Sequence, residues 1–217
     1  QISAIILAAG SGKRSGLKYN KVLYVINEKK VIDYSLETFK KHKEFKEIIL
    51  VVAENELDYF TMRYAHKVDK IIIGGAERQD SVYKALNKAN CGKVLIHDGA
   101  RPFIPEDAIQ KIISKLETED SITLGVKVKN TIQEVDGNRV VKTFDRSKLI
   151  ITQTPQAFDT GLLIEAHELA MDDTFYGTDD TMLMEKYMGI KAYVVKGDYR
   201  NIKLTTKEDI KLLEVIL

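Results

Sequence analysis

The chain has a single cysteine, Cys91, among its 217 residues. A lone thiol excludes a disulfide framework and a cysteine-rich metal site, and it fits the reducing cytoplasm, where we expect this protein. Long apolar runs are also missing. The longest are strand-sized, and the first residues lack a charged region followed by a long apolar stretch. The sequence therefore predicts neither export nor a membrane span.

An excess of charge of either sign is absent too. The 33 Lys and Arg residues nearly balance the 32 Asp and Glu residues, which gives a formal net charge of +1. No overall basic field would attract nucleic acid, so any anion site must be local. Because linkers, repeats and low-complexity tracts are also lacking, we expect one domain over residues 1–217, with an arm.

Short β-rich apolar runs alternate with amphipathic stretches. The apolar runs lie at residues 4–7, 47–53, 70–75, 93–98 and 122–128, and the clearest amphipathic stretches at 31–42 and 80–89. Continuous apolar runs are typical of strands buried on both faces, and their alternation with helices is typical of a mostly parallel, doubly wound sheet. The predicted fold class is therefore α/β.

Glycine-rich or charged loops stand at the ends of three of these runs: AAGSGKR, GGAERQDS and HDGARPF. In open α/β sheets, ligands bind beyond the carboxyl ends of the strands. We therefore expect these loops to form the binding site.

The first loop, within ILAAGSGKRSGLKYNK (6–21), looks like a phosphate cradle but matches neither well-known template. After Gly10 and Gly12 the next glycine is Gly16, one position late for the Rossmann G-x-G-x-x-G. The residue five before Gly12 is Leu7, which excludes a Walker A loop. What remains is a backbone cradle rimmed by the cations Lys13, Arg14, Lys18 and Lys21.

Residues 130–146 interrupt the alternation. Two short β-like runs flank Asp136-Gly137-Asn138, a glycine-containing hairpin turn. A two-stranded hairpin cannot bury both faces alone, so we interpret it as an arm that packs on another subunit. The alternative is a hairpin that lies on its own sheet.

Seven motifs, in this order, resemble the 2-C-methyl-D-erythritol 4-phosphate cytidylyltransferase family along essentially the whole chain: LAAGSGKR, GGAERQDSVYKAL, HDGARPFI, DRSKL, TQTPQAF, GTDD and NIKLTTKEDI. The resemblance implies a Rossmann-like nucleotidyltransferase sheet with a protruding β-arm. It implies transfer of CMP from CTP to the methylerythritol phosphate, with release of pyrophosphate, in the non-mevalonate isoprenoid pathway. It also implies Mg²⁺ as cofactor and a homodimer joined through the 130–146 arm.

The resemblance further implies that cations carry the catalysis. An anionic phosphate oxygen attacks the α-phosphorus of CTP, so the reaction needs positioning and charge neutralisation rather than a nucleophilic side chain. The implied catalytic residues are Arg14, Lys21, Arg146 and Lys203. Arg146 and Thr131 are implied to reach the acceptor in the neighbouring subunit's cleft.

CTP is implied to contact the first two loops and the end of the fourth apolar run. The implied contacts are Leu7, Ala8, Ala9, Gly10, Gly12, Gly74, Ser81 and Asp98. The compact Gly74-Gly75 loop would read cytosine and exclude a purine; alternatively, it is merely a turn and Ser81 caps or lines a helix. We expect Mg²⁺ to be held mainly by the CTP phosphates, with Asp98 as a second candidate ligand because hard cations prefer oxygen.

The acceptor is implied to contact Gly99, Ala100, Arg101, Thr131, Arg146, Thr154 and Thr178. Arg101 could instead orient its loop through internal hydrogen bonds, and the two threonines at 154 and 178 could instead cap the helices that begin near residues 158 and 179. His97 is interpreted as a structural strand residue. The chain departs from the usual family residues at Val22, Ala76, Asn130 and Ile150.

Two other functions compete with this one. A ribitol-5-phosphate cytidylyltransferase shares the fold and the triphosphate loop, but such enzymes tend to have Ser-Val where Gly99-Ala100 stands. A non-catalytic nucleotide-binding module would be expected to lose cations of the implied catalytic set, and this chain keeps all four.

Overall fold

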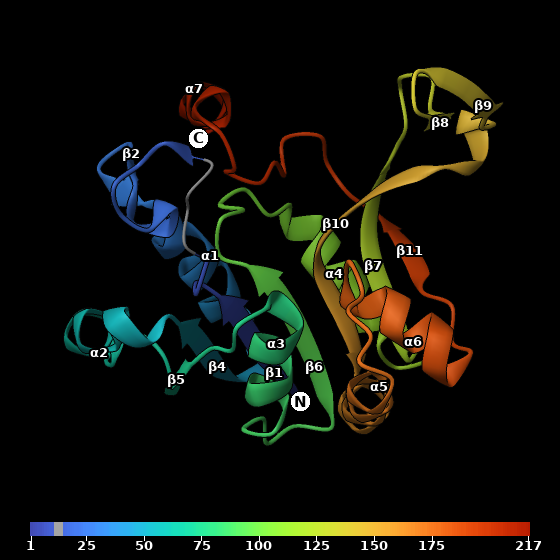
Figure 1. Ribbon diagram of the computed structural model, residues 1–217. Helices are drawn as coiled ribbons and strands as arrows, with labels where there is room; N and C mark the ends of the chain where they lie inside the picture. The colour runs from blue at the N-terminus through green and yellow to red at the C-terminus, as the bar shows by residue number, and fades with distance from the viewer. Residues whose placement is uncertain (11–14) are drawn as a thin grey trace.

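The computed structural model describes residues 1–10 and 15–217. Its centre is a seven-stranded sheet with the order β11-β7-β10-β6-β1-β4-β5 (Figure 1). The strands are β1 (Ile2–Leu7), β4 (Phe45–Val52), β5 (Lys70–Ile73), β6 (Lys93–Asp98), β7 (Ser121–Lys127), β10 (Ile150–Asp159) and β11 (Tyr193–Lys196). Only β10 runs antiparallel to its neighbours, β6 and β7. The prediction of a mostly parallel α/β sheet is confirmed.

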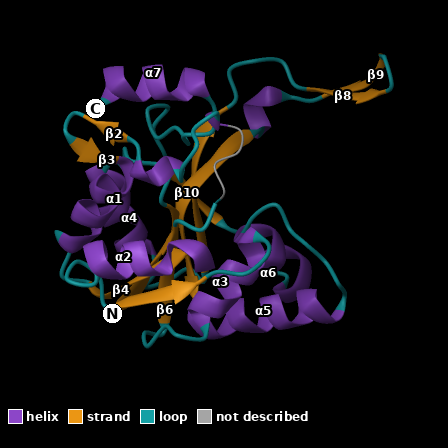
Figure 2. Cartoon of the chain, turned by 60° about the vertical axis from the view of Figure 1, so that its left-hand side comes forward, coloured by secondary structure: helices purple, strands orange, loops and turns teal. Residues whose placement is uncertain are grey.

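Helices cover both faces of the sheet (Figure 2). They are α1 (Val31–Lys40), α2 (Leu57–Tyr64), α3 (Arg78–Leu86), α4 (Glu106–Lys115), α5 (Thr160–Asp172), α6 (Asp180–Met188) and α7 (Lys207–Ile216), with short 3₁₀ turns η2 (Lys21–Leu23), η3 (Glu54–Glu56) and η4 (Arg146–Lys148). Asp159 and Asp179 cap α5 and α6, because their side chains accept hydrogen bonds from the first-turn amides. Within the described residues, no helix is long and apolar enough to cross a membrane.

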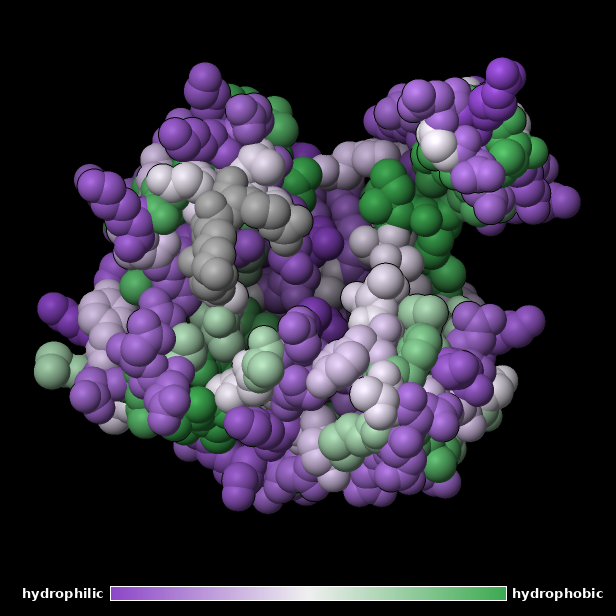
Figure 3. All heavy atoms as spheres, viewed as in Figure 1, coloured by the Kyte–Doolittle hydropathy of each residue, from purple (hydrophilic) through white to green (hydrophobic). Residues whose placement is uncertain are grey.

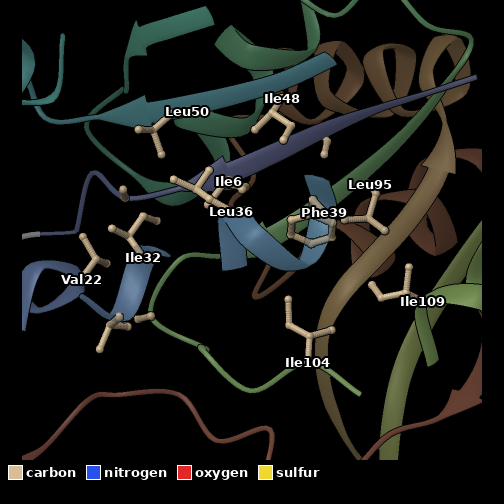
Figure 4. Packing of buried hydrophobic residues seen from close by; sticks show 14 of the residues in the cluster. Ile6, Val22, Ile32, Leu36, Phe39, Ile48, Leu50, Leu95, Ile104 and Ile109 are labelled. Atoms are coloured by element: carbon tan, nitrogen blue, oxygen red, sulfur yellow. The ribbon is translucent and has the colours of Figure 1, made fainter. Parts of the chain in front are cut away.

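The period of two along the strands divides the core into two layers. Ile48 and Leu50 of β4 face α1, where they meet Leu36 and Phe39 (Figure 4). Their neighbours Ile49 and Val51 face the opposite layer, under α3, α5 and α6. Since both faces are covered, the strands read as continuous apolar runs.

The hairpin forms where the sequence predicts it. Strands β8 (Gln133–Asp136) and β9 (Arg139–Thr143) make a separate two-stranded sheet, and its turn carries Gly137 at φ 55°. A second small ribbon pairs β2 (Val25–Ile26) with β3 (Lys29–Lys30). The hairpin projects from the body in both ribbon views (Figures 1 and 2), and residues 129–143 are all exposed. It therefore does not lie on its own sheet.

Apolar side chains gather on this arm and on the segments that join it to the sheet (Figure 3). The exposed apolar residues there are Ile132, Val135, Val140, Val141, Ile150 and Ile151. Exposed clusters of this kind mark interaction surfaces. The expectation that the arm packs on another subunit remains a prediction that this surface favours.

Candidate active site

A cleft of about 600 Å³ opens at the carboxyl ends of β1 and β6. It is lined by Leu7, Ala8, Ala9, Gly10, Asn20, Lys21, Val22, Gly75, Ala76, Glu77, Arg78, Ser81, Asp98, Ala100 and Lys203. The lining combines all three loops selected from the sequence with Lys203, which follows β11. This is the position at which open α/β sheets bind ligands.

The first loop offers backbone donors to the cleft. The amide of Ala8 donates to Val51 at 2.7 Å, which continues the sheet by one residue. Within the described part of the chain, the next two amides, of Ala9 and Gly10, donate to no protein acceptor. Consecutive backbone amides without protein acceptors can bind an anion. The predictions for Gly12 and Arg14 lie outside the described residues.

Asn20 holds the far end of the loop in place. Its Nδ2 donates to the carbonyl of Ala8 at 2.6 Å and to Glu56 at 2.8 Å, and its Oδ1 accepts from the amide of Val22. These bonds fix η2 beside the end of β1 and so place Lys21 at the cleft. Asn20 was not among the residues predicted from the sequence, because its role depends on a contact across the loop.

The second loop is held by its own hydrogen bonds. Ser81 Oγ accepts from the amide of Gly75 at 3.0 Å and donates to the carbonyl of Glu77 at 3.1 Å. Lys84 Nζ donates to the carbonyl of Gly74 at 2.9 Å. These bonds hold the loop in place, and Gly75 lines the cleft. Gly74 lines an adjoining hollow, which shares Ala9, Gly75 and Ala76 with the cleft. The contact of Gly74 with CTP remains a prediction.

Asp98 lies among three cations. Its Oδ2 is 2.9 Å from Lys203 Nζ and 3.6 Å from Arg101 Nε, and its Oδ1 is 3.5 Å from Arg78 Nε. Burial raises the pKa of Asp98, but Arg78, Lys203 and Arg101 together outweigh burial and hold the pKa well below its usual range. Asp98 is therefore an anion at neutral pH.

Backbone hydrogen bonds and close packing hold the rest of the third loop. The amide of Gly99 donates to the carbonyl of Leu7 at 2.8 Å, and an added Cβ would stand only 2.8 Å from that backbone oxygen, so only glycine fits. Arg101 does not line the cleft, and its Nη1 donates to the carbonyl of Asn201 at 2.8 Å. This favours the loop-orienting alternative for Arg101. Ala100 does line the cleft, and its carbonyl accepts from the amide of Leu204, which brings Lys203 alongside.

His97 and Thr154 form a buried pair behind Asp98. Thr154 Oγ1 accepts from the amide of Asp98 at 3.0 Å and lies 3.1 Å from His97 Nδ1. Because a carbonyl oxygen can only accept, His97 Nε2 donates to the carbonyl of Arg101 at 2.9 Å, and Nδ1 accepts a hydrogen bond from the Thr154 hydroxyl. Thr154 is therefore not a helix cap, and its predicted contact with the acceptor would have to compete with these bonds.

Burial lowers the pKa of His97 to about 4. The unfolded chain has an ordinary histidine of pKa about 6.5, so it gains a proton at a higher pH than the folded chain. The stability that neutral His97 contributes is thus complete above pH 6.5 and is lost as the pH falls toward 4, at about 1.4 kcal/mol per pH unit. We expect the difference in unfolding free energy between wild type and His97→Gln, measured with denaturant, to shrink by about 3 kcal/mol over this window. A constant difference would contradict the assignment.

The remaining predicted residues lie away from the cleft. Thr131 and Arg146 are exposed at the base of the arm, where Arg146 Nη1 donates to the carbonyl of Lys129 at 2.6 Å. Thr178 is exposed just before α6, whose cap is Asp179. None of the three lines the cleft of its own chain. Their roles as contacts of the acceptor remain predictions.

Arg78 is another cleft residue, besides Asn20, that the sequence did not predict. It lines the cleft from the first turn of α3 and pairs with Asp180, 102 positions further along the chain. The motif GGAERQDS contains it, but a charge that follows a glycine turn also suits an ordinary helix start. Only the ion pair with Asp180, which is distant in sequence, distinguishes a cleft residue from an ordinary helix start.

The comparisons with known proteins agree on one family. A family model described as 2-C-methyl-D-erythritol 4-phosphate cytidylyltransferase matches residues 2–217. A relative with this name from Bacillus thuringiensis (strain Al Hakam) is 44% identical over 98% of this chain and 96% of its own length. Another from Clostridioides difficile (strain 630) is 41% identical over 99% and 93%. The solved 4-diphosphocytidyl-2C-methyl-D-erythritol synthase of Anaerococcus prevotii DSM 20548 is similar with a TM-score of 0.87 and 34% identity, covering 99% of this chain and 94% of that one.

Proposed function

Because this chain belongs to the 2-C-methyl-D-erythritol 4-phosphate cytidylyltransferase family, we propose that it transfers CMP from CTP to 2-C-methyl-D-erythritol 4-phosphate. The products are 4-diphosphocytidyl-2-C-methyl-D-erythritol and pyrophosphate, and the reaction belongs to isoprenoid biosynthesis. The observation that carries the proposal is the cleft at the ends of β1 and β6. It is lined by Ala9 and Gly10, whose amides donate to no acceptor among the described residues, and by Lys21, Lys203 and Asp98.

The reaction requires the protein mainly to position the two substrates and to neutralise their negative charge. An oxygen of the acceptor's phosphate attacks the α-phosphorus, the bond from that phosphorus to the bridging oxygen breaks, and pyrophosphate leaves. Two anions repel each other as they approach, and cations on both offset this repulsion in a partly desolvated cleft. Among the described residues, Lys21 and Lys203 line the cleft and would supply this charge, and the loop amides would hold the triphosphate.

We propose that Mg²⁺ enters with CTP, held mainly by phosphate oxygens. When bound, it neutralises phosphate charge. Asp98 fits a direct ligand poorly, because three cations already surround its carboxylate. No group of three or more His, Cys, Asp or Glu residues in the described chain could hold a metal ion. We therefore expect the activity to depend on Mg²⁺ because the phosphate oxygens of CTP bind it.

We also propose a cytoplasmic homodimer. The exposed apolar residues of the arm, among them Val135, Val140 and Val141, support association with a second copy. The single cysteine supports a reducing compartment. Thr131 and Arg146 would then act in the partner's cleft.

The deciding experiment measures pyrophosphate release with CTP and three acceptor conditions. These are methylerythritol 4-phosphate, ribitol 5-phosphate and no acceptor. We expect release only with the first. Release only with ribitol 5-phosphate would replace the proposed acceptor, and no release with any would contradict the activity.

CTP should be strongly preferred over ATP. The 74–77 loop is fixed by the bonds of Ser81 and Lys84, so it cannot widen for a purine without losing them. A wrong base would also leave buried donors unpaired, which costs about 1–3 kcal/mol for each group. The check is kcat/KM for both nucleotides with the same acceptor. Similar values would show that this loop does not select the base.

A further inference from the structure

A chain of charges leads from the cleft into the core. Arg78 Nη1 donates to Asp180 Oδ2 at 2.8 Å, whereas Arg78 Nε stands 3.5 Å from Asp98 Oδ1. The second distance exceeds that of a direct N–H···O hydrogen bond. Arg78 is thus bonded to Asp180 and only near Asp98.

Asp180 is held on both of its oxygens. Its Oδ1 lies 3.1 Å from His167 Nε2, and both side chains are at most 1% exposed. Burial raises the pKa of Asp180, but Arg78 and His167 outweigh it, so the pKa lies below its usual value. A carboxylate so placed keeps its charge and its direction.

The backbone of Arg78 is fixed against the same region. The neighbouring Gln79 donates through Nε2 to the carbonyl of Phe175 at 2.9 Å and accepts through Oε1 from the amide of Gly177 at 2.9 Å. These bonds join the first turn of α3 to the segment that leads into α6. The motifs ERQDS and GTDD therefore meet beside the cleft.

The described cations approach the two carboxylate oxygens of Asp98 to different distances. Oδ2 takes Lys203 at 2.9 Å, while Oδ1 accepts no hydrogen bond from any described residue. Because Asp98 lines the cleft, Oδ1 is an acceptor for a hydroxyl group of a bound molecule. A guanidinium released from Asp180 would be drawn to Asp98 as the nearest remaining anion and would occupy this oxygen.

We propose that Asp180, supported by His167, is a positioning residue that holds Arg78 back from Asp98 and so keeps Asp98 Oδ1 available to a hydroxyl of bound CTP. The inference rests on the proposed function, because it takes CTP as the molecule that Asp98 contacts. It assigns no contact with substrate to Asp180 or His167.

Asp180→Asn tests this, because it keeps the shape and an acceptor for Arg78 but removes the charge. We expect KM for CTP to rise about tenfold, the size of one hydrogen bond to a charged group, with kcat nearly unchanged. In an Arg78→Gln background the same change should add less than about twofold, since no guanidinium remains to be held back.

Glu47→Gln is the matched control. Glu47 is also buried and ion-paired, 2.6 Å from Lys70, but it stands near the amino end of β4, opposite the cleft. It should lower the melting temperature and leave KM unchanged. A general loss of folding would instead affect both variants alike.

Two outcomes would overturn the inference: a KM for CTP within about twofold of wild type in Asp180→Asn, or an equal rise with and without Arg78. If Asp180→Asn does not fold, His167→Leu and His167→Gln take its place. The glutamine of His167→Gln can still donate to Asp180, so this variant should have a KM for CTP near that of wild type, whereas His167→Leu should have a higher one. Equal KM values for the two variants would contradict the proposal. Wild-type protein without CTP-dependent pyrophosphate release would refute the proposed function instead.

Discussion

Replacing Lys21 by alanine should lower kcat by a factor of about 10² or more while leaving the fold intact. Lys21 begins η2 and lines the cleft at the end of β1. A charge at that position stabilises the extra negative charge that develops as the bond to pyrophosphate breaks. Because Lys21 is half-buried at the cleft rather than packed in either core layer, its loss should cost little stability.

The measurement is steady-state release of pyrophosphate, together with thermal unfolding. Lys18→Ala is the matched control, since Lys18 is an exposed lysine three positions earlier that does not line the cleft. It should retain wild-type kcat. A Lys21→Ala protein within threefold of wild type would end the assignment of Lys21 as a catalytic residue.

The sheet could be predicted where strands are apolar on both faces. Residues 47–53 and 93–98 read as strands because each side chain has a covered layer to enter, and they match β4 and β6 within two residues. Strand β10 escapes this reasoning. It carries buried polar residues and Pro155 in its interior, and both argue against a central strand from sequence.

The structure explains how β10 tolerates them. Gln156 donates to Thr123 at 3.1 Å and to Asp179 at 2.9 Å, and Gln153 donates to the carbonyl of Asp198 at 2.8 Å. The register with β7 shifts between Gln153 and Gln156, on either side of the proline. These partners lie 23 to 45 positions away, so no local pattern could reveal them.

The same limit applies to the candidate site. The binding loops at the strand ends could be predicted because they are rich in glycine and charged residues, and the loops after β1, β5 and β6 all line the cleft. The direction in which each side chain points could not be predicted from the sequence. Thr154 turned out to serve His97 and the amide of Asp98, and Arg78 gained its place from Asp180. When a polar residue has two possible hydrogen-bond partners, the folded structure determines which one it contacts, and its neighbours in sequence do not.

Mixing an Arg146→Ala protein with a Lys21→Ala protein should restore activity that neither has alone. Arg146 is exposed at the base of the arm and does not line the cleft of its own chain. If it serves the partner's cleft, a heterodimer has one site with an intact Lys21 from one subunit and an intact Arg146 from the other. With random exchange of equal amounts, about half the dimers are mixed, so about a quarter of the wild-type activity should return.

Subunit exchange must first be demonstrated, for example with two tags of different mass. A mixture of Lys21→Ala with Lys203→Ala is the matched control. Both lysines line the same chain's cleft, so every site in that mixture keeps one defect and no activity should return. If the Arg146→Ala mixture also stays inactive despite proven exchange, Arg146 acts in its own subunit. The cross-subunit arm would then be wrong, while the nucleotide site built from β1 and β6 would be unaffected.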